Sequence, residues 1–306
     1  MNVVLAGEES AGLRALDLIG MRDDVRVVLV LSSGRTVAPS LAEVAASRGF
    51  RVDPAKRVGS PTLAGELADL GTDLLLNVHS LSIAHADVVA VPRIGSFNLH
   101  PGPLPGYAGL NTPSWAIHER ASAYGSTLHW MTAEVDAGPI AYSATFSITE
   151  EDTGLTLMGR CVRAGVPLLT RLLDDAARDD GSIPRVVQPT PPVNRGAGPP
   201  NEGWVEWSQT AERIEAFVRA SDYGPFPSPW GRPRATLDGV EVGLVRAYAL
   251  CGGHVAGAEP GTVLEVIGDE VEVATGGGVL RVSRLERKGE RLLATEVATP
   301  GARFSA

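Results

Sequence analysis

Three side chains in one central stretch, residues 96–140, have the types and the spacing for acyl-transfer chemistry. Asn98 and His100 stand two positions apart in an apolar run, so an extended strand would place both side chains on one face. Asp136 follows the next predicted strand, residues 126–131. If the two strands are neighbours, an amide, an imidazole and a carboxylate meet at one edge of a sheet.

These residue types suit the stabilisation of a negatively charged oxygen. An asparagine donates hydrogen bonds without titrating, a histidine carries a proton near neutral pH, and an aspartate orients the histidine, raises its pKa or accepts a proton. Donors aimed at one point stabilise an oxyanion. The stretch has no nucleophile elbow, which favours direct transfer between two bound substrates. An isolated Asn-x-His pair also occurs in structural roles, so the residues alone leave both interpretations open.

The first half of the chain alternates strand and helix patterns. Aliphatic and β-branched runs bounded by turns predict strands buried on both faces, and helical apolar spacing separates them. This alternation of strands and helices predicts a Rossmann-like α/β domain with a parallel sheet. Such sheets bind ligands outside the carboxyl ends of their strands. The expected strands are residues 2–6, 25–31, 51–52 and 73–78, and the expected helices are 12–19, 41–47 and 62–70.

Two further segments complete the predicted first domain. The turn at residues 7–12 lacks the G-x-G-x-x-G spacing and carries two glutamates, which disfavours a dinucleotide and favours turn and packing roles for its glycines. A long helix is expected over residues 153–175, with Thr153 as its cap and Cys161 in the core. Pro167 should kink or break this helix.

A change of composition divides the chain of 306 residues into two predicted domains. Residues 1–187 form the expected catalytic domain, and the Pro- and Gly-rich residues 188–203 read as an exposed linker. Residues 204–306 begin with an amphipathic helix over 204–221 and continue with short strands up to a last one at 292–297. This pattern predicts a small antiparallel β-barrel of the OB type.

Charge and cysteine usage narrow the class of protein. The net charge of −9 disfavours long nucleic acid as a partner, because neutralising phosphates supplies most of that affinity. The two cysteines, Cys161 and Cys251, and the histidines have no metal-ligand spacing, so we expect no disulfide framework and no metal. No run approaches the length that spans a bilayer, and no secretory signal is present, so we expect a cytoplasmic protein with no membrane contact.

Two motifs give the central stretch a specific resemblance. Residues 98–109, NLHPGPLPGYAG, resemble the N-x-H-P-S-L-L-P-x-Y-x-G loop of formyltransferases that use 10-formyltetrahydrofolate. Residues 125–140 resemble the G-x-T-x-H…D-x-G-x-I stretch of the same family in the same order. The predicted helix and barrel also look like the C-terminal domain of the methionyl-tRNA and sugar members. The resemblance therefore covers the whole chain and implies an N-formyltransferase.

The resemblance implies roles for individual residues. Asn98 and His100 would hold the formyl oxygen, while Asp136 would keep His100 cationic and assist proton removal from the attacking amine. His129 matches a family position, although Trp130 beside it is equally consistent with packing. His79, His85 and His118 read as loop or surface residues, and His254 as part of a barrel loop. The folate donor is expected on Leu81, Ser82, Ile83, Ala84, Thr132, Ala133, Glu134 and Val135, and the amine on Ser10, Gly109 and Asn111.

Departures from the family loop bear on the acceptor. Gly102-Pro103 replaces the common S-L, and Gly106 and Ala108 replace residues that are often basic in the tRNA branch. We therefore predict a small-molecule amine or an aminoacyl carrier protein in natural-product biosynthesis as acceptor, with nucleic acid disfavoured. The alternatives are a 10-formyltetrahydrofolate hydrolase, a folate-binding or carrier-docking module without turnover, and a methionyl-tRNA formyltransferase. The basic residues available for a carrier are Arg232, Arg234, Arg284, Arg287 and Lys288.

Overall fold

The computed structural model describes residues 1–34, 39–178, 182–250 and 257–306, so Cys251 and His254 lie outside the described residues. The chain forms two compact units, each made of segments that are separate in the sequence. The first unit contains Met1–Gly109, Ala123–Ser147 and Met158–Asn194. The second unit contains Leu110–Ser122, Ile148–Leu157 and Arg195–Ala306.

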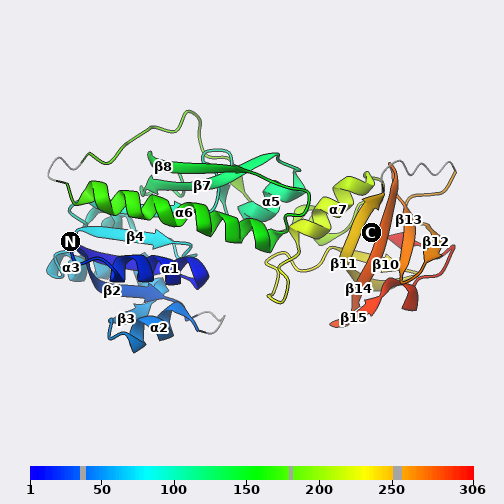
Figure 1. The fold of residues 1–306 in the computed structure, drawn as a ribbon, viewed down its shortest axis with the longest axis horizontal. Coiled ribbons are helices and arrows are strands. Elements are labelled where there is room, and N and C mark those ends of the chain that lie inside the picture. Colours follow the sequence, from blue (N-terminus) through cyan, green and yellow to red (C-terminus); the bar gives the residue numbers. More distant parts are fainter. Residues whose placement is uncertain (35–38, 179–181, 251–256) are drawn as a thin grey trace. The chain divides into compact units, whose positions relative to one another are not determined.

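A seven-stranded sheet in the order β3-β2-β1-β4-β5-β7-β8 forms the centre of the first unit (Figure 1). The five strands from β3 to β5 pair in parallel, as the sequence predicted, and β7 and β8 pair antiparallel beside them. The pairing of β5 with β7 confirms that the two strands of the central stretch are neighbours. The strands are β1 (Asn2–Gly7), β2 (Arg26–Ser32), β3 (Val52–Pro54), β4 (Leu74–Val78), β5 (Gly95–His100), β7 (Ala123–Trp130) and β8 (Ile140–Ser147).

Helices cover both faces of this sheet because its strands are apolar on both sides. Along β1, Val3 and Leu5 pack in one core with helices α1, α2 and α6, whereas Val4 and Ala6 pack in a second core with α3 and α4. This alternation follows from the two-residue repeat of a strand. The helices are α1 (Glu9–Gly20), α2 (Leu41–Ser47), η1 (Ala55–Gly59), α3 (Thr62–Asp69), α4 (Ala86–Ala90) and α6 (Gly154–Ala176).

Helix α6 bears out two of the sequence predictions and corrects a third. The Thr153 hydroxyl accepts a hydrogen bond from the Thr156 backbone N–H at 3.3 Å, which confirms Thr153 as the cap. Cys161 is fully buried, as expected for a core residue. The helix continues through Pro167, so the expected break is absent. Packing of its apolar stripe offsets the hydrogen bond that proline removes.

The turn between β1 and α1 is filled by the protein's own side chains. A Cβ on Gly12 would lie 2.8 Å from Leu41 Cδ2, so glycine is needed for close packing of α1 against α2. The Glu8 carboxylate accepts hydrogen bonds from the Ser33 N–H at 2.6 Å and the Ser32 hydroxyl at 3.2 Å. These contacts support packing and turn roles for the glycines of this segment.

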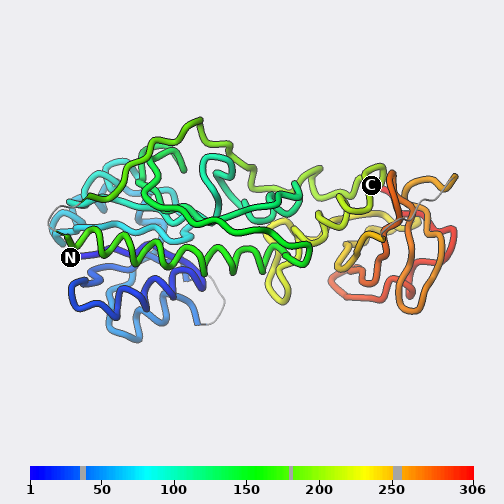
Figure 2. The backbone as a smooth tube through the Cα atoms, turned by 45° about the horizontal axis from the view of Figure 1, so that its top comes forward, coloured from blue at the N-terminus to red at the C-terminus, as the bar shows by residue number. Residues whose placement is uncertain are grey.

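The second unit contains an antiparallel sheet in the order β12-β13-β14-β11-β10-β16, with β15 paired to β14. The sheet is curled (Figure 2), and its first and last strands approach each other where Val263 N–H donates to Ala302 O at 2.9 Å and Phe304 N–H to Gly261 O at 2.8 Å. This half-barrel confirms the predicted small antiparallel domain. Its strands are β10 (Arg234–Leu237), β11 (Val240–Leu250), β12 (Val263–Ile267), β13 (Glu270–Ala274), β14 (Val279–Arg287), β15 (Glu290–Leu293) and β16 (Phe304–Ser305).

Shorter elements complete the described chain, and none of its helices is long and apolar enough to cross a membrane. In the second unit, helix α5 packs against α7, which buries Ile214, Phe217 and Val218 as predicted. The remaining elements are α5 (Thr112–His118), η2 (Pro200–Gly203), α7 (Ala211–Ala220), η3 (Ala294–Glu296) and the two-stranded ladder of β6 (Ala108–Gly109) and β9 (Asn194–Arg195).

Two boundaries in the second unit differ from the prediction. The helix expected from residue 204 begins only at Ala211, because the preceding residues pair with strands, as Trp204 does with Arg234. The strand expected over 292–297 ends at Leu293 and continues as a 3-10 turn. Strand β16 has two residues, too few to produce a periodic pattern, and the sequence did not predict it.

Candidate active site

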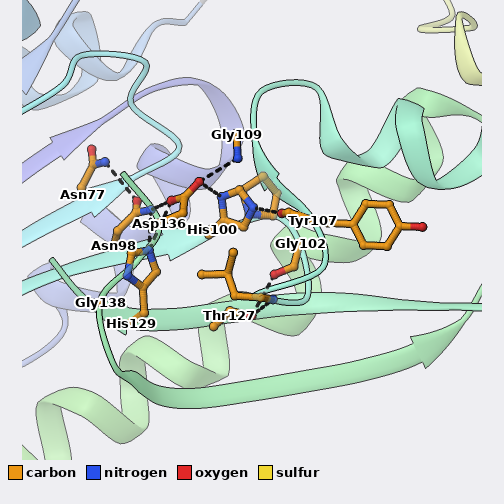
Figure 3. A network of polar contacts seen from close by, with 12 residues as sticks. Asn77, Asn98, His100, Gly102, Tyr107, Gly109, Thr127, His129, Asp136 and Gly138 are labelled. Carbon is orange, nitrogen blue, oxygen red and sulfur yellow. Dashed lines mark hydrogen bonds and ion pairs between the residues drawn. The ribbon is translucent and has the colours of Figure 1, made fainter. Parts of the chain in front are cut away.

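The structure brings the three predicted catalytic residues together at the carboxyl end of β5 (Figure 3). Asn98 and His100 point to the same side of the strand, as their spacing predicted. The Asn98 Nδ2 atom lies 3.2 Å from Asp136 Oδ1, and the His100 Nδ1 atom lies 3.6 Å from Asp136 Oδ2. His100 and Asp136 are both buried. The carboxylate therefore faces two potential donors in a site shielded from water.

Asp136 reaches this site by a route that the sequence did not indicate. Because β7 runs antiparallel, it ends at Trp130 opposite Phe97, and residues 131–139 fold back toward the end of β5. Asp136 adopts a left-handed backbone conformation with φ of 55°, which is uncommon for a residue with a side chain. The Gly109 N–H donates to Asp136 Oδ2 at 2.8 Å. The carboxylate is thus positioned by a loop and by individual hydrogen bonds.

The imidazole of His100 lies between two acceptors. Its Nε2 atom is 2.6 Å from the Tyr107 carbonyl oxygen, which only accepts, so Nε2 carries a hydrogen. Its Nδ1 atom faces Asp136. Burial lowers the pKa of His100, whereas Asp136 and the Tyr107 carbonyl act in the opposite direction and His129 lowers the pKa further. The net result is a lowered pKa, with burial as the largest cause, so the neutral ring is favoured over the cationic ring that the resemblance implied.

The absence of a side chain at Gly102 leaves space for the His100 ring. A Cβ at that position would lie 2.8 Å from both His100 Nε2 and the Tyr107 carbonyl oxygen. The glycine at this position therefore lets the backbone pack directly against the His100 ring. The hydroxyl of Thr127 holds the same loop, because it donates to Gly102 O at 2.8 Å and accepts from Leu104 N–H at 3.1 Å.

His129 belongs to the same network. Its Nδ1 atom lies 2.8 Å from the Trp130 carbonyl oxygen and must carry the hydrogen of that bond. Its Nε2 atom lies 3.0 Å from Asn98 Nδ2 and 3.4 Å from Asp136 Oδ1. The sequence left His129 between packing and chemistry, and the structure gives it direct contact with two of the three predicted catalytic residues.

The electrostatics of the cluster keep Asp136 ionised. Burial alone would raise the pKa of Asp136, but the hydrogen bond with His129, the charge of His100 and the Gly109 N–H outweigh it and lower this pKa to about 2. Asp136 is therefore a carboxylate at neutral pH. A carboxylate this weakly basic acts mainly through its charge and its hydrogen bonds.

Two residues at the end of β4 were missed as parts of the site. Asn77 Nδ2 donates to Asn98 Oδ1 at 3.0 Å, which turns the Asn98 Nδ2 group toward His129 and Asp136. His79 follows with φ of 55°, and its Nε2 is buried without a hydrogen-bond partner among the described residues. Burial, together with His100, lowers the pKa of His79 to about 4. His79 lies in the loop after β4, which agrees with its prediction as a loop or surface residue, but its ring is buried beside His100. The Asn-Val-His run at the end of a parallel strand was the available signal for this.

The segments predicted to bind the folate donor are two loops beside this network. Leu81, Ser82, Ile83 and Ala84 follow β4, whereas Thr132, Ala133, Glu134 and Val135 lie between β7 and β8, just before Asp136. Leu81 is 63% exposed, Ile83 71% and Val135 51%. Exposed apolar side chains on non-helical backbone fit a flat ring system that is apolar on its faces and polar at its edge. That these two loops bind the folate donor stays a prediction.

The residues predicted to bind the amine are Ser10, Gly109 and Asn111, and their role as one site stays a prediction. Gly109 contacts Asp136 directly. Ser10 is exposed in the first turn of α1. Asn111 belongs to the second unit, where its Nδ2 donates to Ala197 O at 2.7 Å.

Two other histidines have structural surroundings. His118, in the second unit, packs against Trp115, Phe217 and Trp230 with its Nδ1 buried and unpartnered within the described chain, so its predicted surface position is wrong. Burial lowers the pKa of His118. His85 caps α4 by accepting from Asp87 N–H at 3.2 Å. Among the described residues, no cluster of histidine, cysteine, aspartate and glutamate could hold a metal ion.

Comparison with known proteins gives this geometry a context. Residues 3–173 match the family described as formyl transferase, and residues 199–302 match its C-terminal domain. The methionyl-tRNA formyltransferase of Xylella fastidiosa (strain 9a5c) is 29% identical over 306 residues, covering 96% of this chain and 95% of that protein. That of Stenotrophomonas maltophilia is 28% identical over 304 residues, covering 96% and 95%.

Solved structures share the fold at low sequence identity. HypX from Aquifex aeolicus in complex with tetrahydrofolic acid is 19% identical with a TM-score of 0.63. The match covers 96% of this chain and 46% of HypX, so the chain spans about half the length of that protein. An N-formyltransferase from Helicobacter canadensis, in complex with folinic acid and dTDP-3-aminofucose, is 15% identical with a TM-score of 0.64, covering 92% and 98%.

Proposed function

Because the chain belongs to the formyl transferase family, we propose that it moves the formyl group of 10-formyltetrahydrofolate to a primary amine. The observation that carries this proposal is the convergence of donors on one point. Asn98 Nδ2 and the Gly109 N–H donate to the Asp136 carboxylate at 3.2 and 2.8 Å, and His100 Nδ1, which is a donor in the protonated ring, lies 3.6 Å from it. An oxygen that gains negative charge during formyl transfer needs the same kind of surroundings.

Each residue of the cluster has a defined task in this proposal. The folate donor supplies an activated formyl group when bound. Asn98, oriented by Asn77, and His100 are the donors that we assign to the formyl oxygen as its charge develops. Each must then turn a hydrogen from its present partner in the cluster toward the substrate. Asp136 has a lowered pKa and stays anionic, so it stabilises the proton on His100 and the positive charge on the attacking amine. No side chain of the cluster needs to form a covalent intermediate.

The methionyl group of methionyl-tRNA is the first candidate acceptor. The curated relatives named above are methionyl-tRNA formyltransferases, which supports the alternative stated from the sequence more than the small-molecule prediction. The second unit adds an observation from the structure. Exposed Arg246 on β11 pairs directly with exposed Arg284 on β14, and within the described chain neither has an ion-pair partner. Two opposed like charges are unfavourable, and a phosphate would relieve their repulsion.

Neighbouring charges support an anionic acceptor of this kind. Arg287, Lys288 and Arg291 are also exposed on β14, β15 and their turn. By contrast, Arg232 lies within 3.9 Å of Asp222 and Glu286 carboxylate oxygens, so its charge is balanced within the unit. On β14 and β15, however, Arg287 pairs with Glu290 and Arg291 with Glu286, so the Arg246–Arg284 pair is the part of this sheet that supports an anionic acceptor.

A carrier-bound aminoacyl group or a free amine is the second candidate. The buried methyl group of Ala108 leaves no room for a basic side chain without movement of the loop. At Gly106 a Cβ would have only an ordinary contact, 3.7 Å from Pro103 O, so packing permits a larger residue there. The missing basic residue at position 106 is therefore a difference in chemistry, and it favours an acceptor other than tRNA.

The test measures tetrahydrofolate release from 10-formyltetrahydrofolate with initiator methionyl-tRNA, an aminoacyl carrier protein, an amino sugar nucleotide or no acceptor. We expect release to require one of the amines. Equal release without an acceptor would favour the hydrolase, and binding of the folate without release in any mixture would favour a binding module. Transfer to tRNA should weaken steeply with salt, whereas transfer to a small amine should not.

A further inference from the structure

A segment without helix or strand connects both loops of the active site. Residues 184–193, which we call the strap, bond first with the strands: Pro184 O accepts from Trp130 Nε1 at 2.8 Å, and Val186 exchanges two hydrogen bonds with Ile140 at 2.8 and 2.9 Å. Val193 then bonds with the other loop, donating to Pro105 O at 2.8 Å and accepting from Ala108 N–H at 3.2 Å. The strap thus contacts the segments on both sides of the catalytic cluster.

Gln188 is the strap residue whose side chain reaches the Asp136 turn. Its Nε2 group donates to Asp136 O at 2.7 Å and to Gly138 O at 2.8 Å. Carbonyl oxygens only accept, so the amide must present Nε2 to this turn and Oε1 away from it. Oε1 is buried with no partner among the described residues. An unpaired buried acceptor is unfavourable, and the two donated hydrogen bonds offset that disadvantage.

The turn that Gln188 contacts cannot hold its shape by local preference alone. Asp136 has a left-handed backbone, and a Cβ on Gly138 would lie 1.8 Å from the Trp130 carbonyl oxygen. Such conformations persist where the surroundings fix them. Gln188 bonds to both ends of the three-residue turn and leaves the Asp136 carboxylate on the opposite side, facing Asn98 and His100.

We propose that Gln188 is a positioning residue for formyl transfer, which holds the 136–138 turn so that the Asp136 carboxylate faces its partners. Nothing in the sequence motif includes this residue, because it lies in a Pro-rich segment far along the chain. The consequence for turnover rests on the proposed function. The consequence for the geometry of Asp136 and His100 does not.

The first test is Gln188→Met, which keeps the length of the side chain and removes both donors. Turnover should fall about 10- to 100-fold, because small displacements of catalytic groups have effects of this size. The KM for the folate donor should change by less than about threefold, because the exposed loops still bind it. Gln209→Met is the matched control, since Gln209 donates to Glu206 in the second unit. Unchanged turnover in Gln188→Met would overturn the proposal.

A double-mutant cycle separates positioning from general stability. If Gln188 acts through Asp136, adding Gln188→Met to Asp136→Asn should reduce turnover by less than about threefold beyond Asp136→Asn alone. A loss as large as in the wild-type background would mean that Gln188 acts independently of Asp136. Gln188→Glu, which also lacks the donors, gives a second variant for the same cycle if Gln188→Met does not fold.

The titration of His100 tests the geometry without any acceptor. The groups that face His100 are Asp136, the Tyr107 carbonyl, His129 and His79. Asp136 raises the pKa of His100, so a displaced carboxylate in Gln188→Met should lower that pKa further, as measured by NMR of the imidazole. An unchanged titration overturns the positioning role. A lowered pKa in a protein that formylates none of the tested amines would support Gln188 and count against the proposed function alone.

Discussion

The two halves of the candidate active site are built in opposite ways. Asn98 and His100 lie on a regular strand that the sheet holds from both sides, so their common direction follows from the strand's two-residue repeat. Asp136 lies on a loop and has a left-handed backbone conformation. Its position there depends on hydrogen bonds from Gly109 and Gln188 and on the close packing of Gly138. The comparison shows that the positions of Asn98 and His100 depend on the pairing of whole strands, whereas the position of Asp136 depends on a few individual contacts.

The largest expected effect is on the strand half. His100→Ala should lower turnover by about 100- to 1000-fold, because it removes a donor to the developing negative charge. Affinity for the folate, measured by equilibrium binding, should stay nearly unchanged, since the ring is not part of the exposed loops. His85→Ala is the control, because His85 only caps α4. A His100→Ala protein with most of its activity would remove His100 from the mechanism.

A substitution in the loop that carries Asp136 should affect the loop half and leave the strand half in place. Gly138→Ala places a Cβ 1.8 Å from the Trp130 carbonyl oxygen, so the loop must move and carry Asp136 with it. We expect turnover to fall about 10- to 100-fold, with a lower melting temperature. At Gly20, near the end of α1, a Cβ meets nothing within 4 Å, so Gly20→Ala should leave turnover unchanged. If both variants behave alike in steady-state assays, the loop is not held as described.

A smaller effect is expected at the edge of the strand half. His79→Asn keeps a residue that tolerates the left-handed backbone and removes a buried nitrogen that has no partner within the described chain. If a ligand normally pairs with that nitrogen, turnover should fall about tenfold, the size of one lost hydrogen bond. Thermal stability should be unchanged or higher, since no protein contact is lost. A lower melting temperature with normal turnover would make His79 structural.

The smallest expected effect concerns stability in acid. The pKa of Asp136 is lowered from 3.8 to about 2 on folding, so its ionised form stabilises the native state above about pH 4. This contribution should be lost as the pH falls through about 2. Asp136→Asn should therefore show a flatter dependence of melting temperature on pH between these values. An identical slope in both proteins would mean that the carboxylate gains nothing from its buried partners.

The sequence predicted the regular half well for a physical reason. Apolar runs such as residues 73–78 and the Asn98-x-His100 alternation depend on local period, which is visible without the fold. The resemblance pointed to Asp136 and matched His129, and the structure shows how both reach Asn98.

The remaining features depend on contacts between distant segments. Gln188 meets the Asp136 turn across many intervening residues, and His79 is buried only because β4 and β5 lie side by side. The start of α7 at Ala211 likewise depends on pairing of the preceding residues with strands. Sequence periodicity contains no information on contacts between segments that are distant in the sequence.

The composition of the second unit has a consequence for how proteins of this type can be recombined. Helix α5 comes from the middle of the sequence, yet its Trp115 and His118 contact Trp230 and Phe217 edge to face, and Ser114 bonds with Tyr223. A graft that transferred only residues 204–306 to another protein would leave these rings without their partners. An exchange of the second unit between relatives would therefore have to move residues 110–122 and 148–157 together with residues 195–306.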